Sequence, residues 1–340
     1  MDSISSLIII SIIVILVISY LLIFRKKLRV LGIERQKLEG SILSQLNKSF
    51  LMFKEMKIFL KHKNKVAAVI MEPVIGQKHR CNNCFDNQKQ QYRKHPIKSF
   101  KACKNDPNMN ILKEIKKIAH ENEALLIFDE MISGFRFSMG GACEYFGVTP
   151  DLATFGKGIT NGMPLGVLAG KADYMKEFDK VFLSSTYAPE ALTLAAASAS
   201  IDFYKKKDVI KDLWKKGEYI EYNFEKIIQK YNLSSNVSLA GYSVRLMINT
   251  HGADGIQDPK LASLYQQEMF RNGILCFSGV LMLSYALTDE DLASLVDAFD
   301  KTCKVIKSAV SGSYSIESYL ECSPGSPVFK GLREKNAVSN

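Results

Sequence analysis

Two short, wholly apolar segments separated by an amphipathic one constrain the fold of this chain more than any other feature. The apolar segments are residues 66–71 and 124–128, and residues 111–123 carry apolar side chains at helical spacing. Short apolar runs of this kind are typical of strands buried on both faces of a parallel sheet. Strand, helix and strand in this order predict a βαβ unit, and therefore an α/β fold with a mostly parallel sheet.

The remaining pattern divides the folded part of the chain into a large and a small domain. The large domain is predicted over residues 64–235, with further strands at 152–155 and 165–170 and helices at 189–205 and 209–231. The small domain is predicted to be α+β over residues 236–334, and 335–340 form a tail. Its expected strands are 244–249, 274–277 and 281–285, and its expected helices are 259–272 and 288–311.

Residues 4–24 are a nearly unbroken run of Ile, Leu and Val. A helix of this length reaches about 30 Å, the thickness of the hydrocarbon core of a bilayer. Basic residues follow the run and none precedes it, which favours a retained anchor over a cleaved signal peptide and places the C-terminal side in the cytoplasm. We therefore predict a single-pass membrane protein with a transmembrane anchor at 1–24 and a basic amphipathic linker helix at 25–63.

The composition excludes a disordered chain, because 47% of residues are hydrophobic and 24% are charged. The net charge of +10 is partly explained by residues 77–108, which hold eight Lys or Arg residues. Cys81, Cys84 and Cys103 in this stretch could bind zinc, but a second close cysteine pair is missing. A basic insertion without metal is the favoured interpretation. Without an aromatic ladder or a recognition helix, no nucleic-acid partner is expected.

Two residues suggest chemistry at the ends of the predicted strands. Asp129 follows one apolar segment, at the end of the strand where α/β sheets bind ligands. Lys157 follows the strand at 152–155 and lies between two glycines. A desolvated lysine amine can attack a carbonyl, and a carboxylate can keep a pyridine nitrogen protonated. The pair fits a pyridoxal phosphate site, although an ordinary salt bridge between two structural residues is the alternative from these residues alone.

The flanking motifs, in their order along the chain, carry a more specific signal. They are Glu72-Pro73, Phe128-Asp129-Glu130, Gly134-Phe135-Arg136, Pro150-Asp151-Leu152, Gly156-Lys157-Gly158, Asn161-Gly162-Met163-Pro164 and Ser185-Thr186-Tyr187. Over about residues 60–334 the chain resembles the class III aminotransferases of PLP fold type I, including the glutamate-1-semialdehyde aminomutase group. The resemblance implies a large PLP-binding domain and a cofactor, pyridoxal 5′-phosphate.

The resemblance also implies roles for single residues. Lys157 falls on the Schiff-base lysine, which also moves a proton, and Asp129 falls on the aspartate that pairs with the pyridine nitrogen. Thr186 falls on the threonine that reaches the cofactor phosphate of the neighbouring subunit, which implies a homodimer. The implied reaction transfers an amino group from a small-molecule donor to a keto or aldehyde acceptor, with a sugar or a semialdehyde as candidates. Arg136 and Arg245 are candidates for binding a substrate carboxylate, with salt bridges as the alternative.

One part of the family pattern is missing from the residues before the first predicted strand. Residues 1–60 contain no counterpart of the N-terminal half, including the Gly-Ser/Thr turn that holds the cofactor phosphate at a helix N-terminus. We therefore expect a partial large domain. Two alternatives to a self-sufficient enzyme stay open: a catalytically inactive, membrane-anchored remnant that binds a partner, and complementation by another chain.

Overall fold

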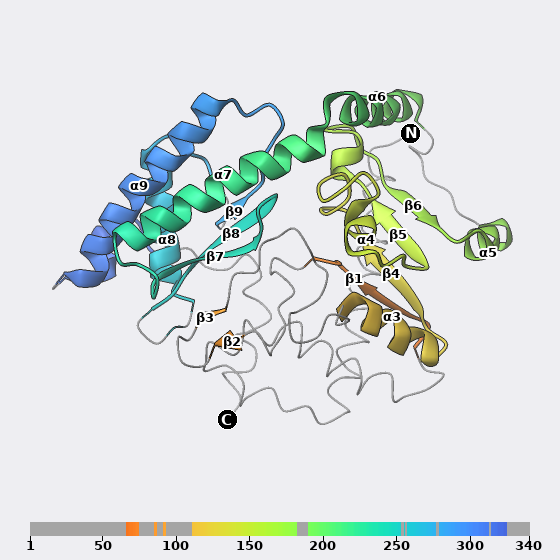
Figure 1. The fold of residues 1–340 in the computed structure, drawn as a ribbon, viewed down its shortest axis with the longest axis horizontal. Coiled ribbons are helices and arrows are strands. Elements are labelled where there is room, and N and C mark those ends of the chain that lie inside the picture. Colours follow the sequence, from red (N-terminus) through yellow and green to blue (C-terminus); the bar gives the residue numbers. More distant parts are fainter. Residues whose placement is uncertain are drawn as a thin grey trace, which may run out of the picture.

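The computed structural model describes residues 66–74, 85–86, 91–92, 111–181, 190–252, 255, 257–276, 279–312 and 314–324. Two sheets, each covered by helices, lie at opposite ends of α7, as Figure 1 shows. The elements around the first sheet are β1 (Ala68–Met71), α3 (Ile111–Glu121), β4 (Leu125–Asp129), α4 (Gly141–Phe146), β5 (Leu152–Phe155), η3 (Lys157–Ile159), β6 (Val167–Gly170), α5 (Ala172–Met175), η4 (Lys176–Lys180) and α6 (Ala191–Lys207). Those that follow are α7 (Val209–Lys230), β7 (Val237–Tyr242), β8 (Arg245–Thr250), α8 (Pro259–Arg271), β9 (Val280–Leu281), α9 (Asp289–Ser311) and η5 (Ile316–Tyr319).

The first sheet has the order β1-β4-β5-β6. β1 and β5 both pair parallel with β4, and β6 returns antiparallel to β5. The α/β fold is therefore confirmed, with a sheet that is mixed. α3 connects β1 to β4 as the predicted βαβ crossover, and it contacts β4.

Burial differs between β1 and β4, although their apolar sequences predict that both are buried on both faces. In β4, Leu126 and Phe128 are fully buried. In β1, Ile70 is 60% exposed, so the prediction that this strand is buried on both faces is wrong. Among the described strands β1 lies at the edge of the sheet. An apolar run indicates a strand, but it does not report whether another element covers each of its faces.

The predicted helices of the C-terminal part are confirmed, and side chains fix their first turns. The Asp258 carboxylate accepts hydrogen bonds from the backbone N–H groups of Lys260 and Leu261 at the start of α8. Thr288 and Asp291 form a reciprocal capping box at the start of α9. Such caps satisfy N–H groups that have no partner within a helix, which is why these helices begin where they do.

The second sheet corrects three expectations about strands. Its order is β7-β8-β9, and both pairings are antiparallel. The sequence reading missed β7, and the strand expected at 281–285 is only the short β9. Residues 274–276 form no strand. Leu275 is 82% exposed and Cys276 is buried, so burial alternates along this segment as it does in a strand, but its backbone pairs with no strand among the described residues.

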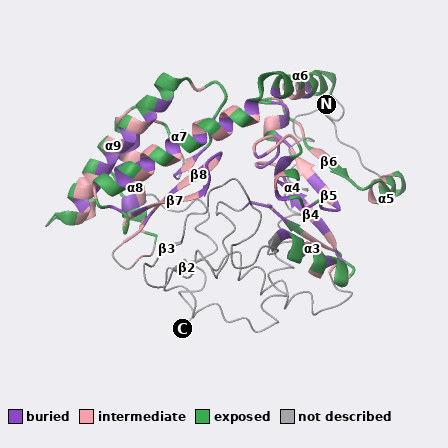
Figure 2. Ribbon diagram, in the orientation of Figure 1, coloured by how far each residue is buried: buried purple, intermediate pink, exposed green. Residues whose placement is uncertain are grey.

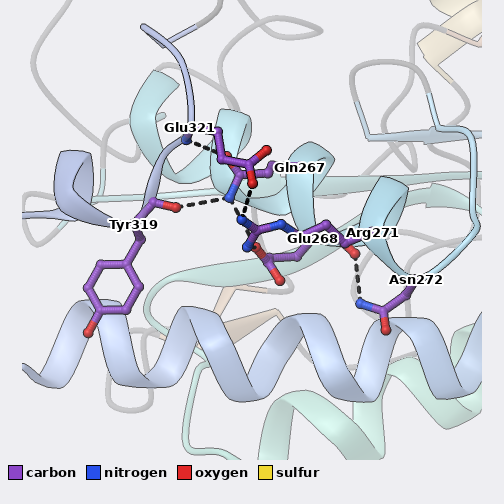
Figure 3. Close-up of polar contacts among 6 residues, drawn as sticks. All are labelled: Gln267, Glu268, Arg271, Asn272, Tyr319 and Glu321. Carbon is purple, nitrogen blue, oxygen red and sulfur yellow. Dashed lines mark hydrogen bonds and ion pairs between the residues drawn. The ribbon is translucent and has the colours of Figure 1, made fainter.

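A network of side chains fastens the segment after α9 to the outer face of α8 (Figure 3). The Gln267 amide donates to the Tyr319 carbonyl at 2.9 Å and accepts from the Glu321 N–H at 2.8 Å. The Arg271 guanidinium pairs with Glu268 at 2.6 Å and with Glu321 at 2.5 Å. The end of the described chain is therefore held by polar contacts at the surface.

Several predictions fall on residues that the structure does not describe. They concern the anchor at 1–24, the linker helix at 25–63, Thr186, and the cysteines Cys81, Cys84 and Cys103. Within the predicted insertion at 77–108, only the two-residue pairing of β2 (Phe85–Asp86) with β3 (Gln91–Tyr92) is described. Over the part of the chain that is described, no helix is long and apolar enough to cross a membrane.

Candidate active site

The carboxyl ends of β4 and β5 lie side by side, because these strands are parallel neighbours. Asp129 is the last residue of β4 and is paired in register with Thr154 of β5. Its Oδ1 accepts hydrogen bonds from the Met131 N–H at 3.0 Å and from the Thr154 hydroxyl at 3.3 Å. Both donors use the same oxygen, and Oδ2 has no hydrogen-bond partner within the described residues. One oxygen of a half-buried carboxylate is therefore available to a ligand.

Lys157 begins the 3-10 turn η3, two residues after β5. Its φ of +46° places a non-glycine residue in the left-handed region. Gly156 before it is closely enclosed, because an added Cβ would lie 2.4 Å from Met131 Cε. Lys157 is exposed, and no described residue forms a hydrogen bond or an ion pair with its ammonium group. The salt bridge between Asp129 and Lys157 that the sequence left open is therefore not formed.

Glu130 is fully buried and fixes the chain directly after Asp129. Its carboxylate accepts hydrogen bonds from the Ser133 hydroxyl at 2.5 Å and from the N–H groups of Ala142 and Cys143 at 2.9 and 2.7 Å. The two N–H groups belong to the first turn of α4. Gly141 adopts a φ of +81°, and an added Cβ would lie 2.8 Å from this carboxylate. Glu130 therefore holds the connection from β4 to α4 in a form that only glycine at 141 allows without strain.

Asp151 fixes the opposite end of β5, and the sequence reading missed it as a structural residue. Its fully buried carboxylate accepts from the Leu126 N–H at 2.8 Å and pairs with Lys171 at 2.6 Å and His120 at 2.8 Å. Burial alone raises the pKa of Asp151, but these hydrogen bonds outweigh it and lower the pKa to about 2. The only sequence signal was an acid directly before an apolar strand. Asp151 joins α3, β4 and the residue that follows β6 around β5.

The two arginines proposed for a substrate carboxylate instead connect the two sheets. Arg136 Nη1 donates to the carbonyls of Val244 at 3.0 Å and Leu283 at 3.1 Å. Burial lowers the pKa of Arg136, and the nearby charge of Arg245 adds to this effect. Arg245 Nη1 pairs with Glu72 at 3.1 Å and donates to the Val74 carbonyl at 2.7 Å. Both residues therefore have partners in the protein, and both lie where the first sheet meets the second.

The described residues offer no group of three or more His, Cys, Asp or Glu side chains that could hold a metal ion. The cysteines considered for zinc lie outside these residues. Burial raises the pKa of the Cys143 thiol to about 11, and the charge of Glu130 contributes. This thiol, which lies beside the β4–α4 connection, therefore stays protonated and is not a nucleophile at neutral pH.

A model of the family described as aminotransferase class-III matches residues 102–315, which is more than half of the chain. The chain belongs to the class-III aminotransferase family. The family resemblance read from the motifs is thus confirmed, and membership in this family indicates pyridoxal 5′-phosphate as the cofactor.

Two curated relatives show how the class-III match extends along the chain. A glutamate-1-semialdehyde 2,1-aminomutase of Ruminiclostridium cellulolyticum is 31% identical and aligns with 72% of this chain and 54% of the relative. A 3-aminobutyryl-CoA aminotransferase of Cloacimonas acidaminovorans is 34% identical over 59% of this chain and 49% of the relative. The chain spans about half the length of the curated relatives it matches.

A solved structure supports the fold of this class-III chain. The FumI protein of Sphingopyxis sp. MTA144, solved in its PLP internal aldimine form, aligns with a TM-score of 0.61 and 18% identity. The alignment covers 81% of this chain and 59% of that one. At this identity the likeness concerns the fold alone, and it agrees with the α/β arrangement around β4 and β5.

Proposed function

We propose that this chain is a PLP-dependent aminotransferase or aminomutase that moves an amino group from a small-molecule donor to a keto or aldehyde acceptor. The observation that carries the proposal is the pair at the ends of the neighbouring parallel strands β4 and β5. Among the described residues, the ammonium of Lys157 and the Oδ2 of Asp129 have no partner. Within the family, a sugar or a semialdehyde is a candidate acceptor.

The residues present fit the aldehyde and the ring nitrogen of the cofactor, because an amine and a carboxylate oxygen without partners among the described residues suit these two groups. Lys157 would hold the cofactor covalently through Nζ until the amino donor displaces it. The released amine would then carry a proton to and from the substrate carbon. Asp129 would accept a hydrogen bond from the ring N–H through Oδ2, while Thr154 and Met131 keep Oδ1 in place. When bound, pyridoxal phosphate supplies an electron sink for the charge that develops on that carbon.

The roles of three further residues are part of the proposal. Thr186 would contact the cofactor phosphate of the neighbouring subunit, as its motif implies, and the working unit would then be a homodimer. Arg245 is the better of the two candidates for a substrate carboxylate, because its buried Nε has no hydrogen-bond partner among the described residues. Arg136 uses its Nη1 on two carbonyls, and reorienting it would leave both of these acceptors without that donor.

A second candidate function rests on the edge strand β1. Ile70 is 60% exposed there, and no described strand pairs with the outer side of β1. Such an edge can pair with a strand of another chain. The chain would then act as a membrane-anchored binding protein without activity, or as one half of an enzyme that another chain complements.

For location we propose a single membrane span through residues 4–24, with the aminotransferase part in the cytoplasm. The support is the apolar run and the basic residues after it. Recovery of the 340-residue chain in the aqueous fraction after alkaline extraction of membranes would contradict this proposal.

The decisive experiment tests the amine of Lys157. The 340-residue chain, held in mild detergent, is incubated with pyridoxal 5′-phosphate, reduced with borohydride, digested and mapped by mass spectrometry. The proposal predicts a stable pyridoxyl group on Lys157 and an absorbance band of the bound cofactor, and Lys157→Ala removes both. Lys176→Ala, which changes another exposed lysine on η4, is the matched control and retains them.

The same experiment separates the second candidate from the first. If the parent chain gives no band and no label at Lys157, the isolated chain is not an aminotransferase. A label that appears only after another chain is added would favour complementation.

A further inference from the structure

α6 is an unusual helix, because little of it is buried. It has 17 residues, and Thr193, Ala197 and Tyr204 are its buried ones. Figure 2 shows most of α6 as exposed. Tyr204 is by far the largest of the three, and it lies in the last turn of the helix, where α6 contacts η3.

The hydroxyl of Tyr204 connects α6 to the turn that carries Lys157. It donates a hydrogen bond to the Gly158 carbonyl at 2.5 Å and accepts one from the Asn161 side-chain amide at 2.8 Å. These partners lie one and four residues after Lys157. The single hydroxyl group thus spans the turn from its first residues to its end.

This turn needs such support, because it is conformationally costly. Lys157 and Asn161 both have positive φ, at +46° and +48°. A left-handed conformation is unfavourable for residues other than glycine, and it persists only where the surroundings enforce it. The Tyr204 hydroxyl bonds to Asn161 itself and to the residue next to Lys157.

The ring of Tyr204 connects the same turn to the strand end that carries Asp129. It stacks on Phe135, with centroids 5.7 Å apart and planes at 23°. Phe135 also has positive φ and lies in the connection that follows β4, and its ring meets Phe155 at the end of β5 edge to face. One side chain from a distant helix therefore contacts the connections after both strands.

We propose that Tyr204 is a positioning residue that sets the Lys157 turn relative to Asp129, an inference that rests on the proposed function. The hydroxyl fixes the turn after β5, and the stacked ring fixes it against the turn after β4. No described residue forms a hydrogen bond or an ion pair with the ammonium group of Lys157 to orient it. The backbone of the turn therefore sets the position from which the lysine side chain extends.

The test uses Tyr204→Phe, which keeps the stacked ring and removes the hydroxyl. The 340-residue chain in mild detergent is titrated with pyridoxal 5′-phosphate, and the borohydride-fixed fraction on Lys157 is measured at each concentration. We expect the half-saturating concentration to rise about fivefold, because the turn loses both hydrogen bonds of the hydroxyl, to Gly158 and from Asn161. The pH midpoint of the cofactor absorbance band is also expected to shift, which a purely structural role would not cause. Hydrogen exchange of residues 156–163 without cofactor should become faster.

Two further variants guard against general effects on folding. Asn161→Gly removes the amide donor while allowing positive φ, and it should weaken labelling in the same direction. Tyr222→Phe, on the exposed side of α7, should behave as the parent. Unchanged labelling, pH midpoint and exchange in Tyr204→Phe, with a labelled parent, would overturn the positioning role and leave the proposed function intact. If the parent is not labelled on Lys157 while hydrogen exchange of residues 156–163 is faster in Tyr204→Phe than in the parent, the proposed function is overturned. The positioning role, which rests on that function, is then overturned as well.

Discussion

Two polar networks in this molecule use the same chemical groups in different surroundings. Around the first sheet, the carboxylates of Glu130 and Asp151 are fully buried and bind backbone N–H groups of neighbouring elements. On the outside of α8, Arg271 is 47% exposed and Glu321 is 69% exposed. The comparison shows that the burial of a charged side chain, more than the number of its contacts, determines how much it contributes to the structure.

The buried network acts on the geometry of the candidate active site. Glu130 follows Asp129 directly and accepts hydrogen bonds from the first turn of α4. Asp151 joins α3, β4 and the residue that follows β6 around β5. Removing either acid leaves N–H donors inside the protein without partners, where water cannot replace the lost acceptor. In the network of Figure 3, water can replace most partners, so little stability is at stake.

The largest effect is expected when Glu130 is removed. In Glu130→Ala, the Ser133 hydroxyl and the N–H groups of Ala142 and Cys143 lose their acceptor, so the free energy of unfolding should fall by about 3 kcal/mol. The urea midpoint of the chain in mild detergent measures this change. Glu114→Ala, on the exposed side of α3, is the control and should shift the midpoint little. Equal midpoints for the two variants would show that the buried carboxylate does not stabilise the sheet.

The next effect concerns Asp151 and depends on pH. Its folded pKa of about 2 lies below the ordinary value of 3.8, so its charged form stabilises the folded state above about pH 4. This contribution, on the order of 2 kcal/mol, is lost as the pH falls through the range from about 4 to 2. The difference in unfolding free energy between the parent and Asp151→Asn should therefore be largest near pH 6 and shrink towards pH 2. A difference that stays constant with pH would contradict the ion pairs with Lys171 and His120.

The smallest effect is expected in the exposed network. Glu321→Ala removes one ion pair with Arg271, while its N–H still donates to Gln267. The free energy of unfolding should fall by less than about 1 kcal/mol, and the difference should disappear at about 1 M salt, which screens exposed charges. The urea midpoint at low and high salt measures both. A loss as large as that in Glu130→Ala would remove the contrast between the two networks.

The sequence predicted the elements of the first sheet well, because each produces its own local pattern. The apolar runs gave β1, β4 and β5, and helical spacing gave α3 and α7. The errors lie where pairing or cover comes from distant residues. Ile70 is exposed although its run reads as buried, and residues 274–276 alternate like a strand without pairing.

The candidate site shows the same division. The motifs identified Asp129 and Lys157 because Asp129 ends one strand and Lys157 lies two residues after the next. No local signal marked Tyr204, since its contacts are with Gly158, Asn161 and Phe135, 43 to 69 residues away in sequence. The sequence did not show the structural role of Asp151 for the same reason, because its partners His120 and Lys171 lie elsewhere in the chain.

By itself, the sequence determined the family, through the family the cofactor, and most elements of the first sheet, since these depend on residue type and spacing along the chain. Only the tertiary structure decided which oxygen of Asp129 is available, that Lys157 has no partner among the described residues, and that Arg136 and Arg245 join the two sheets. The physical reason is that hydrogen bonds and burial depend on groups brought together through space. Neither can be read from a residue and its neighbours alone.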